Sequence, residues 1–303
     1  MALAFHTLDV FTDRRFGGNP LAVVLDADAL APDEMQVVAR ELNLSETVFV
    51  LKPENPAHSA KIRIFTPARE LPFAGHPTVG TAILLAELRA PAVDGERDAI
   101  IALEQVIGPV RVGVRLKAGQ APFAEFDAPK LPEMAGTLPS RDRIADALGL
   151  LPREIGFENH TALRVGAGNM FAYVPVISLE AIARARVNGA SWAAAFPEGE
   201  VDGVYLYTRQ CVHKGASFHA RMFAPQLGVP EDPATGAAAV GFAGVLSAFD
   251  VLPDGPHKRL IEQGHEMGRP STIRLTLIVE GGKLDTVRIG GNAVRMVEGT
   301  IST

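Results

Sequence analysis

Cysteine is nearly missing from this chain of 303 residues, which has Cys211 alone. A lone cysteine excludes an internal disulfide framework and a metal site built from several thiolates. Because such usage is typical of a reducing compartment, we expect a cytoplasmic protein. The net charge of −6 comes without a long run of one sign. This pattern argues against a nucleic-acid partner and favours a small molecule.

Long apolar runs and cofactor motifs are also missing. The longest apolar run, residues 237–249, is too short to cross a bilayer, and the N-terminus has no basic segment before a long apolar core. We therefore expect neither export nor membrane insertion. The histidines lack metal-ligand spacing, residues 166–169 lack the third glycine of a dinucleotide fingerprint, and no P-loop is present. We expect no metal and no cofactor.

Short strand-like runs bounded by glycine, proline or aspartate dominate both parts of the chain, and residues 32–42 read as a surface helix. A stretch rich in proline, glycine and alanine at residues 117–140 separates two similar series of such runs. We place a domain boundary near Gly119. The predicted domains are residues 1–118 together with 288–303, and residues 119–287.

An internal repeat relates these two parts. Residues 76–82 (HPTVGTA) align without gaps on residues 232–238 (DPATGAA), so that His76 lies over Asp232. Three further matches occur in the same order at offsets of 150 to 158: residues 18–24 on 168–174, 46–50 on 202–206, and 63–67 on 221–225. Any single match could be chance. Four in register indicate two similar halves facing each other across a cleft, where small ligands usually bind.

Each half contains an apolar helix that begins at the repeated position. Pro77 and Pro233 suit the first helical position, which makes His76 and Asp232 the expected N-caps of helices that end near residues 88 and 249. Both helices are apolar on nearly every face and must be buried all round. The sequence therefore predicts an α+β fold of two pseudo-symmetric barrel-like domains, each a curled mixed sheet around a central helix.

The helix N-termini would open at the cleft and attract a carboxylate or a developing enolate. Their field would favour neutral His76 and ionised Asp232. The alternative is that both residues only cap their helices. Glu46 is expected in a turn that enters a strand, where it is either a solvated acid or a carboxylate at the cleft. A partly buried carboxylate there could move a proton between carbon atoms.

Five segments together resemble the phenazine-biosynthesis PhzF family over essentially the whole chain: DVFTDRRFGGNPLAVV, LSETVFV, FAGHPTVGTA, EDPATGAA and EQGHEMGRPS. The resemblance implies a diaminopimelate epimerase-like fold and usually a homodimer. The family's best-known activity is isomerisation of trans-2,3-dihydro-3-hydroxyanthranilate, without cofactor or metal.

The resemblance also implies roles for individual residues. Glu46 would take a proton from the hydroxyl-bearing carbon and return it elsewhere on the ring, while His76 and Asp232 hold the substrate. The expected substrate-binding positions are Gly75, Gly236, Ala237 and Asn19. Ala237 departs from the pattern, because the phenazine enzyme has a serine there whose hydroxyl would help to bind the substrate.

The expected function is thus a cofactor-independent isomerase for a small, carboxylated, cyclic substrate. One alternative is a small-molecule binding protein that kept the cleft and lost the chemistry. The other is an amino-acid epimerase, which needs a base on each face. The family's epimerase relatives use two cysteines for this purpose. In this chain Asp202 or Asp232 would have to serve.

Overall fold

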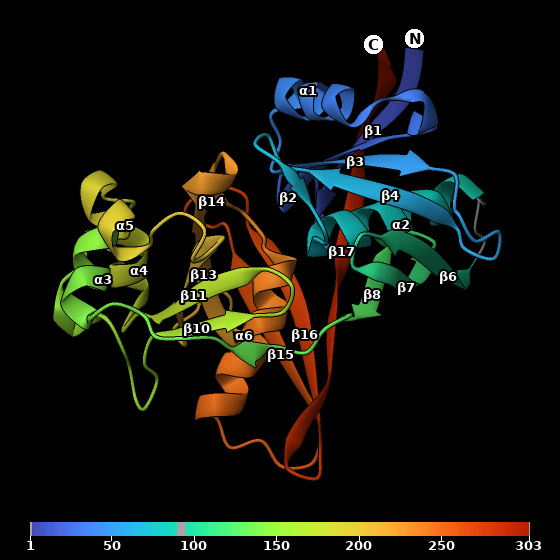
Figure 1. The fold of residues 1–303 in the computed structure, drawn as a ribbon. Coiled ribbons are helices and arrows are strands. Elements are labelled where there is room, and N and C mark those ends of the chain that lie inside the picture. Colours follow the sequence, from blue (N-terminus) through green and yellow to red (C-terminus); the bar gives the residue numbers. More distant parts are fainter. Residues whose placement is uncertain (1, 90–94, 303) are drawn as a thin grey trace.

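The computed structural model describes residues 2–89 and 95–302 and contains two curled sheets, each wrapped around one long helix (Figure 1). Among the described residues four smaller α-helices lie outside the sheets. The first and last strands of the chain lie side by side at the top of Figure 1. No helix of the described residues is long and apolar enough to cross a membrane.

The first half is a closed barrel. Going round it, hydrogen-bonded neighbours run β1, β2, β3, β4, β6, β7, β8, β17 and back to β1. Its elements are β1 (Ala2–Val10), β2 (Asn19–Val24), α1 (Pro32–Leu42), β3 (Glu46–Leu51), β4 (Ala60–Phe65), β5 (Glu70–Leu71), α2 (Gly75–Arg89), β6 (Glu96–Gln105), β7 (Gly108–Lys117), β8 (Phe123–Asp127) and β17 (Lys283–Ser302).

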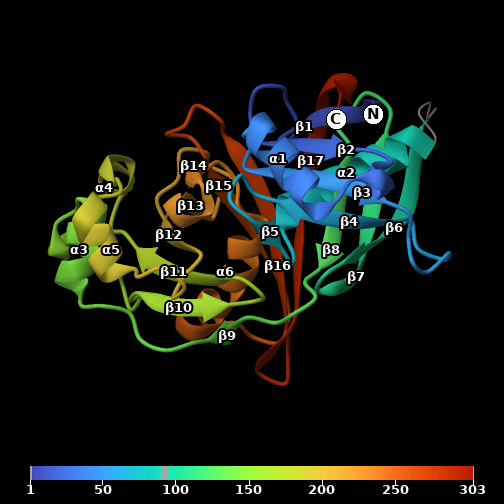
Figure 2. The same cartoon turned by 45° about the horizontal axis from the view of Figure 1, so that its top comes forward.

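The second half repeats this strand order as β9, β10, β11, β12, β13, β15, β16 and β17, but among the described residues no pairing of β17 with β9 closes it. Its elements are β9 (Glu133–Met134), α3 (Arg141–Leu148), β10 (Leu163–Gly166), β11 (Met170–Pro175), α4 (Leu179–Arg184), α5 (Gly189–Ala195), β12 (Gly203–Thr208), β13 (Phe218–Ala224), β14 (Val229–Asp232), α6 (Gly236–Phe249), β15 (Gly255–Gln263) and β16 (Ser271–Glu280). Helices α3, α4 and α5 cover its outer side (Figure 2).

The pairing directions confirm the internal repeat. In the first half the β2–β3 and β4–β6 pairs are parallel, and so are their counterparts β11–β12 and β13–β15. The β1–β2, β3–β4 and β6–β7 pairs are antiparallel, as are β10–β11, β12–β13 and β15–β16. The two halves are therefore copies of one topology.

The long strand β17 joins the two sheets. Its residues 283–290 pair with β16 of the second half, and its residues 293–302 pair with β1 of the first half. Strand β8 follows Gly119, yet it pairs with β7 and β17, so the first sheet extends to Asp127. The division into residues 1–118 with 288–303 and residues 119–287 stays a prediction.

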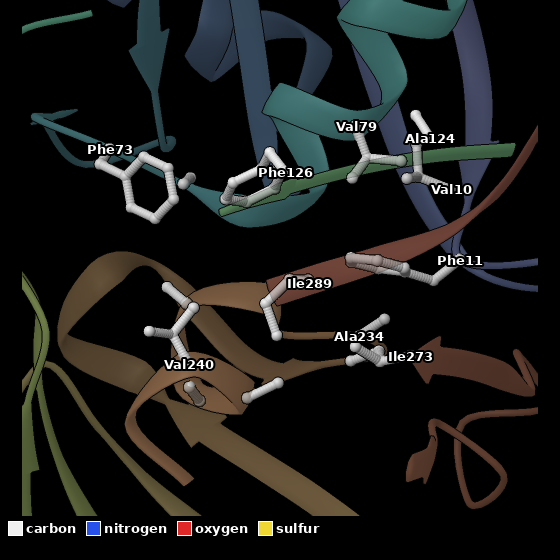
Figure 3. Close-up of a cluster of buried hydrophobic side chains, with 14 of the residues drawn as sticks. Val10, Phe11, Phe73, Val79, Ala124, Phe126, Ala234, Val240, Ile273 and Ile289 are labelled. Carbon is white, nitrogen blue, oxygen red and sulfur yellow. The ribbon is translucent and has the colours of Figure 1, made fainter. Parts of the chain in front are cut away.

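The two central helices are buried as their apolar composition predicts. Helix α2 packs against strands β1, β2, β3, β6, β7, β8 and β17, and α6 packs against β9, β10, β11, β16 and β17. One apolar core continues from one half into the other (Figure 3). In it, Phe73 and Phe126 of the first half meet edge to face with their ring centroids 5.8 Å apart, while Val240 of α6 lies on the other side.

The predicted N-caps are wrong, although the surface helix at residues 32–42 and the dominance of short strands are confirmed. Helix α2 begins at Gly75, so His76 lies inside its first turn. Helix α6 begins at Gly236 with Thr235 as its N-cap, and Asp232 ends strand β14 instead. Pairing of Asp232 with Met222 of β13 draws the segment before α6 into the sheet.

Candidate active site

Four predicted site residues meet between the two halves. Glu46 opens β3, Asn19 opens β2, His76 lies in the first turn of α2, and Asp232 ends β14. His76 Nδ1 lies 3.4 Å from Glu46 Oε2 and 3.2 Å from Asn19 Nδ2. The Asn19 amide donates to Asp232 Oδ1 at 2.7 Å and to the Ala234 carbonyl at 2.9 Å. Asn19 therefore ties the two halves together at the site.

These side chains are withdrawn from water, and burial shifts their pKa values. Burial lowers the pKa of His76 to about 3, so its imidazole is neutral at physiological pH. Burial raises the pKa of Asp232 to about 6, although hydrogen bonds from Thr235, Ser45 and Asn19 oppose the rise. Burial, and then the charge of Asp232, raise the pKa of Glu46 well above its ordinary value. Burial thus favours the protonated form of the Glu46 carboxyl group.

Some polar atoms at this site have no protein partner. Glu46 Oε2, His76 Nε2 and Asn19 Oδ1 are buried without a hydrogen-bond partner among the described residues. An unpaired buried polar atom costs about 1–3 kcal/mol, so such atoms are rare unless a ligand or water satisfies them. Their grouping at one point is what a binding site for a polar small molecule requires.

A narrow cavity of about 30 Å³ opens beside Glu46, His76 and Asp232, and part of it reaches solvent. Its walls are mostly apolar and come from both halves. They include Leu71, Ala74, Phe171, Met222, Leu227, Val229 and Ala237, beside Glu46, His76 and Asp232. A mostly apolar pocket with a few convergent polar groups is typical of small-molecule sites.

The N-termini of α2 and α6 meet at the cavity through Gly75 and Gly236. A Cβ added to Gly75 would lie 2.7 Å from the Gly236 Cα, so only glycine fits at this contact. Both residues and Ala237 line the cavity. Two helix N-termini directed at one space bring unpaired N–H groups and two positive dipole ends to it, an arrangement that favours an anion.

The strand register corrects the predicted counterpart of Glu46. In the first half Leu21 of β2 pairs with Glu46, and in the second half Phe171 of β11 pairs with Gly203. Since residues 18–24 match residues 168–174, Gly203 and not Asp202 occupies the Glu46 position. A Cβ at Gly203 would lie 2.5 Å from Met222 Cε and 2.8 Å from the Phe223 carbonyl oxygen. The second half thus has no room for a matching base.

Asp202, the acid proposed as an alternative base, is engaged elsewhere. It accepts a hydrogen bond from the Met170 N–H at 2.8 Å and forms an ion pair with Arg69 from the other half. Arg269 binds Asp9 and the carbonyls of Gly17 and Gly18, just before Asn19. Both arginines hold segments beside the site.

Sequence reasoning missed two residues that hold Asp232. Thr235 donates its hydroxyl to Asp232 Oδ2 at 2.5 Å. Gln263 donates to the Asp232 carbonyl at 2.7 Å. A signal for Gln263 was present, because residues 103–105 (LEQ) and 261–263 (IEQ) match at an offset of 158, within the range of the other repeats.

Within residues 2–89 and 95–302 there is no group of three or more histidine, cysteine, aspartate or glutamate side chains arranged to hold a metal ion. The fold and the site together define a protein of two similar halves with a buried carboxyl group at their junction.

Comparison with known proteins identifies the family. The family described as phenazine biosynthesis-like protein, PhzC-PhzF, matches residues 8–299. An isomerase of Mesorhizobium japonicum is 51% identical over 97% of this chain and 96% of its own length. The trans-2,3-dihydro-3-hydroxyanthranilate isomerase of Pseudomonas chlororaphis is 35% identical, with 97% of each chain covered. A crystal structure of a PhzF-family protein from Bacillus anthracis superposes with a TM-score of 0.87 at 25% identity, and all of both chains is covered.

The chain therefore belongs to the PhzC-PhzF family of phenazine biosynthesis-like proteins, and it is an isomerase. The predicted family and the predicted epimerase-like fold class are confirmed. The family acts on a small substrate, as we expected.

Proposed function

We propose that this isomerase moves one proton between two carbon atoms of a small cyclic carboxylate, as in trans-2,3-dihydro-3-hydroxyanthranilate. The observation that carries the proposal is the Glu46 carboxyl group, which is buried beside the cavity with Oε2 unpaired and its pKa raised. A carboxyl group that binds its proton tightly is a stronger base once ionised, and it can return the proton later as an acid.

In the proposed reaction the C–H bond at one ring carbon breaks and Glu46 takes the proton. The electron pair moves through the ring to a second carbon, and Glu46 delivers the proton there. The protein regains its starting state, and no electron or proton is gained or lost. Because Glu46 alone both takes and returns the proton, we propose a reaction that uses neither cofactor nor metal.

One face of the substrate would carry the whole transfer. Gly203 occupies the Glu46 position of the second half and leaves no room for a side chain, while Asp202 is bound to Arg69 and to the Met170 N–H. These contacts support a single base. They disfavour the epimerase alternative, because inversion at a carbon requires a base on each face.

Neutral His76 and ionised Asp232 would orient the substrate, with Asn19 fixing the spacing between them. We propose that the N-termini of α2 and α6 at Gly75 and Gly236 bind the substrate carboxylate. Ala237 offers no hydroxyl at the adjoining position, so this part of the site would bind through backbone groups. A homodimer, a cytoplasmic location and the two-domain division stay predictions.

The experiment is a proton NMR time course of the purified protein with trans-2,3-dihydro-3-hydroxyanthranilate in D2O. We expect wild type to convert the compound, Glu46→Gln to be inactive, and Asp202→Asn to retain activity as the matched carboxylate control. Loss of activity in both variants would support two bases. Ligand line broadening without conversion in wild type would favour the binding-protein alternative for this compound, and the same assay would then be run with other cyclic carboxylates.

A further inference from the structure

Gln263, at the end of β15, is fully buried. Both polar atoms of its side-chain amide bind the turn between Asp232 and α6. Its Nε2 donates to the Asp232 carbonyl at 2.7 Å and to Thr235 Oγ1 at 3.1 Å. Its Oε1 accepts from the Thr235 N–H at 3.2 Å. The donor and acceptor pattern of the turn fixes which way the amide faces, because a flipped amide would set oxygen against the Asp232 carbonyl.

This amide decides where the Thr235 hydroxyl proton goes. A hydroxyl has one hydrogen to donate and two lone pairs that accept. Gln263 occupies one lone pair of Thr235 Oγ1, which leaves the hydroxyl proton to point at Asp232 Oδ2, 2.5 Å away. Asp232 Oδ1 receives the Asn19 amide. Each carboxylate oxygen therefore faces a donor, which stabilises the ionised form.

The other half contains the same pair of residues with a different outcome. Gln105 ends β6 as Gln263 ends β15, and it donates to the Thr78 hydroxyl at 3.0 Å. Thr78 donates its proton to the Ala74 carbonyl at 2.7 Å, which is an ordinary backbone contact of the helix start. A glutamine that holds a threonine hydroxyl thus occurs in both halves, although the repeat aligns Thr78 with Ala234 and not with Thr235. In the second half the threonine donates to a carboxylate of the site.

We propose that Gln263 is a positioning residue that orients and ionises Asp232 through the Thr235 hydroxyl. The proposal deepens the function proposed above, since it concerns the carboxylate that would orient the substrate. The part of it that concerns the titration of Asp232 holds whatever the substrate is.

Several other groups influence Asp232. Glu46 of β3 and His76 of α2 flank it in the site. The charge of Asp232 helps to raise the pKa of Tyr205 in β12. Glu231 precedes Asp232 in β14, and its charge helps to raise the pKa of Asp232. Arg221 binds the Glu231 carboxylate in a bidentate pair. Substitutions at Gln263 and Thr235 leave all of these groups in place. A change in the titration of Asp232 would therefore report the hydroxyl contact.

The test follows the carboxyl carbon of Asp232 by ¹³C NMR against pH in protein labelled at aspartate. We expect Gln263→Met to raise the pH midpoint of Asp232 by about one pH unit, and Thr235→Val to raise it by a similar amount. Thr235→Ser keeps the hydroxyl and should restore the wild-type midpoint. In the Thr235→Val background, Gln263→Met should add little, because both changes remove the same contact.

Gln105→Met is the matched control, since it removes the same buried amide from the same place in the other half. We expect it to destabilise the fold while leaving the Asp232 midpoint unchanged. If Gln263→Met does not fold, Gln263→Leu provides the second variant, because it removes the same amide contacts without adding a charge beside Asp232. An unchanged midpoint in the Gln263 variants, or an equal effect in the Thr235→Val background, would overturn the proposal.

Activity separates this inference from the proposed function. If Gln263→Met raises the pH midpoint of Asp232 but the wild-type protein isomerises no carboxylate, the positioning role of Gln263 is supported and the proposed function is contradicted. Where activity is measurable, Gln263→Met should shift the acid limb of the kcat/KM profile to higher pH, and Gln105→Met should not shift it.

Discussion

Gly75 and Gly236 touch backbone to backbone, and through them the first turns of α2 and α6 meet at one point. A Cβ on Gly236 would lie 2.9 Å from the Gly75 Cα and 3.2 Å from Phe11 Cζ. Each residue is the first of its helix, although the repeat aligns Gly236 with Gly80 and not with Gly75. This contact sets the separation of the two helix N-termini and with it the width of the site.

Gly236→Ala should therefore separate the two helix starts. We expect a loss of about 1–3 kcal/mol in the free energy of unfolding, because rigid backbone and not a flexible side chain opposes the new methyl group. Isomerase activity should fall further than stability alone explains. Urea unfolding measures the stability. Gly189→Ala in α5 is the control, since a Cβ there meets nothing within 4 Å. Equal stability of Gly236→Ala and Gly189→Ala would contradict the close contact.

Gly203→Ala tests whether the second half has room for a side chain at the position that matches Glu46. The added methyl group would press on Met222 Cε at 2.5 Å and on the Phe223 carbonyl oxygen at 2.8 Å. We expect a destabilisation of about 1–3 kcal/mol in urea unfolding, and more for Gly203→Asp, which would also bury a charge. Gly113→Ala is a strand control, because its nearest neighbour would be the Glu125 carbonyl at 3.8 Å. A stable Gly203→Asp protein would show that a second carboxylate can be accommodated there.

His76 should make the fold sensitive to acid. Its pKa is about 3 in the folded protein against 6.5 in the unfolded chain, so the unfolded state binds more protons between these values. The stabilisation is fully present above pH 6.5 and is lost as the pH falls. At pH 4.5 the loss amounts to about 3 kcal/mol.

The measurement compares the free energies of unfolding of wild type and His76→Gln at pH 7 and pH 4.5. The difference between the two proteins should move in favour of the variant at the lower pH, because glutamine does not titrate. Asp232 acts in the opposite direction, since its raised pKa makes the protonated carboxyl fit the fold better, but it is present in both proteins and cancels. A difference independent of pH would mean that His76 titrates normally.

Much of this molecule could be predicted from local sequence. The apolar faces of residues 75–89 and 236–249 required burial all round, and only a curled sheet supplies that. The ordered repeat required two similar halves. Glu46, His76, Asp232 and Asn19 followed from the repeat and from the family resemblance, and the structure brings all four together.

Other features depended on pairing between distant segments. Proline at residue 233 suggested a helix start at Asp232, but pairing with Met222 draws that residue into β14, and the helix begins four residues later. Loose similarity placed Asp202 over Glu46, whereas the strand register places Gly203 there. A shift of one residue reverses the side of the sheet that a side chain faces, so local similarity could not decide this.

The sequence by itself determined two buried helices and the acid and imidazole groups near their starts, because burial and periodicity are local properties. The tertiary structure decided which carboxyl groups face the cavity, that Gln263 and Thr235 hold Asp232, and that β17 unites both sheets. Those outcomes depend on hydrogen bonds between residues far apart in the chain, such as Asn19 and Asp232, which are 213 positions apart. Their geometry is set only when the two halves pack together.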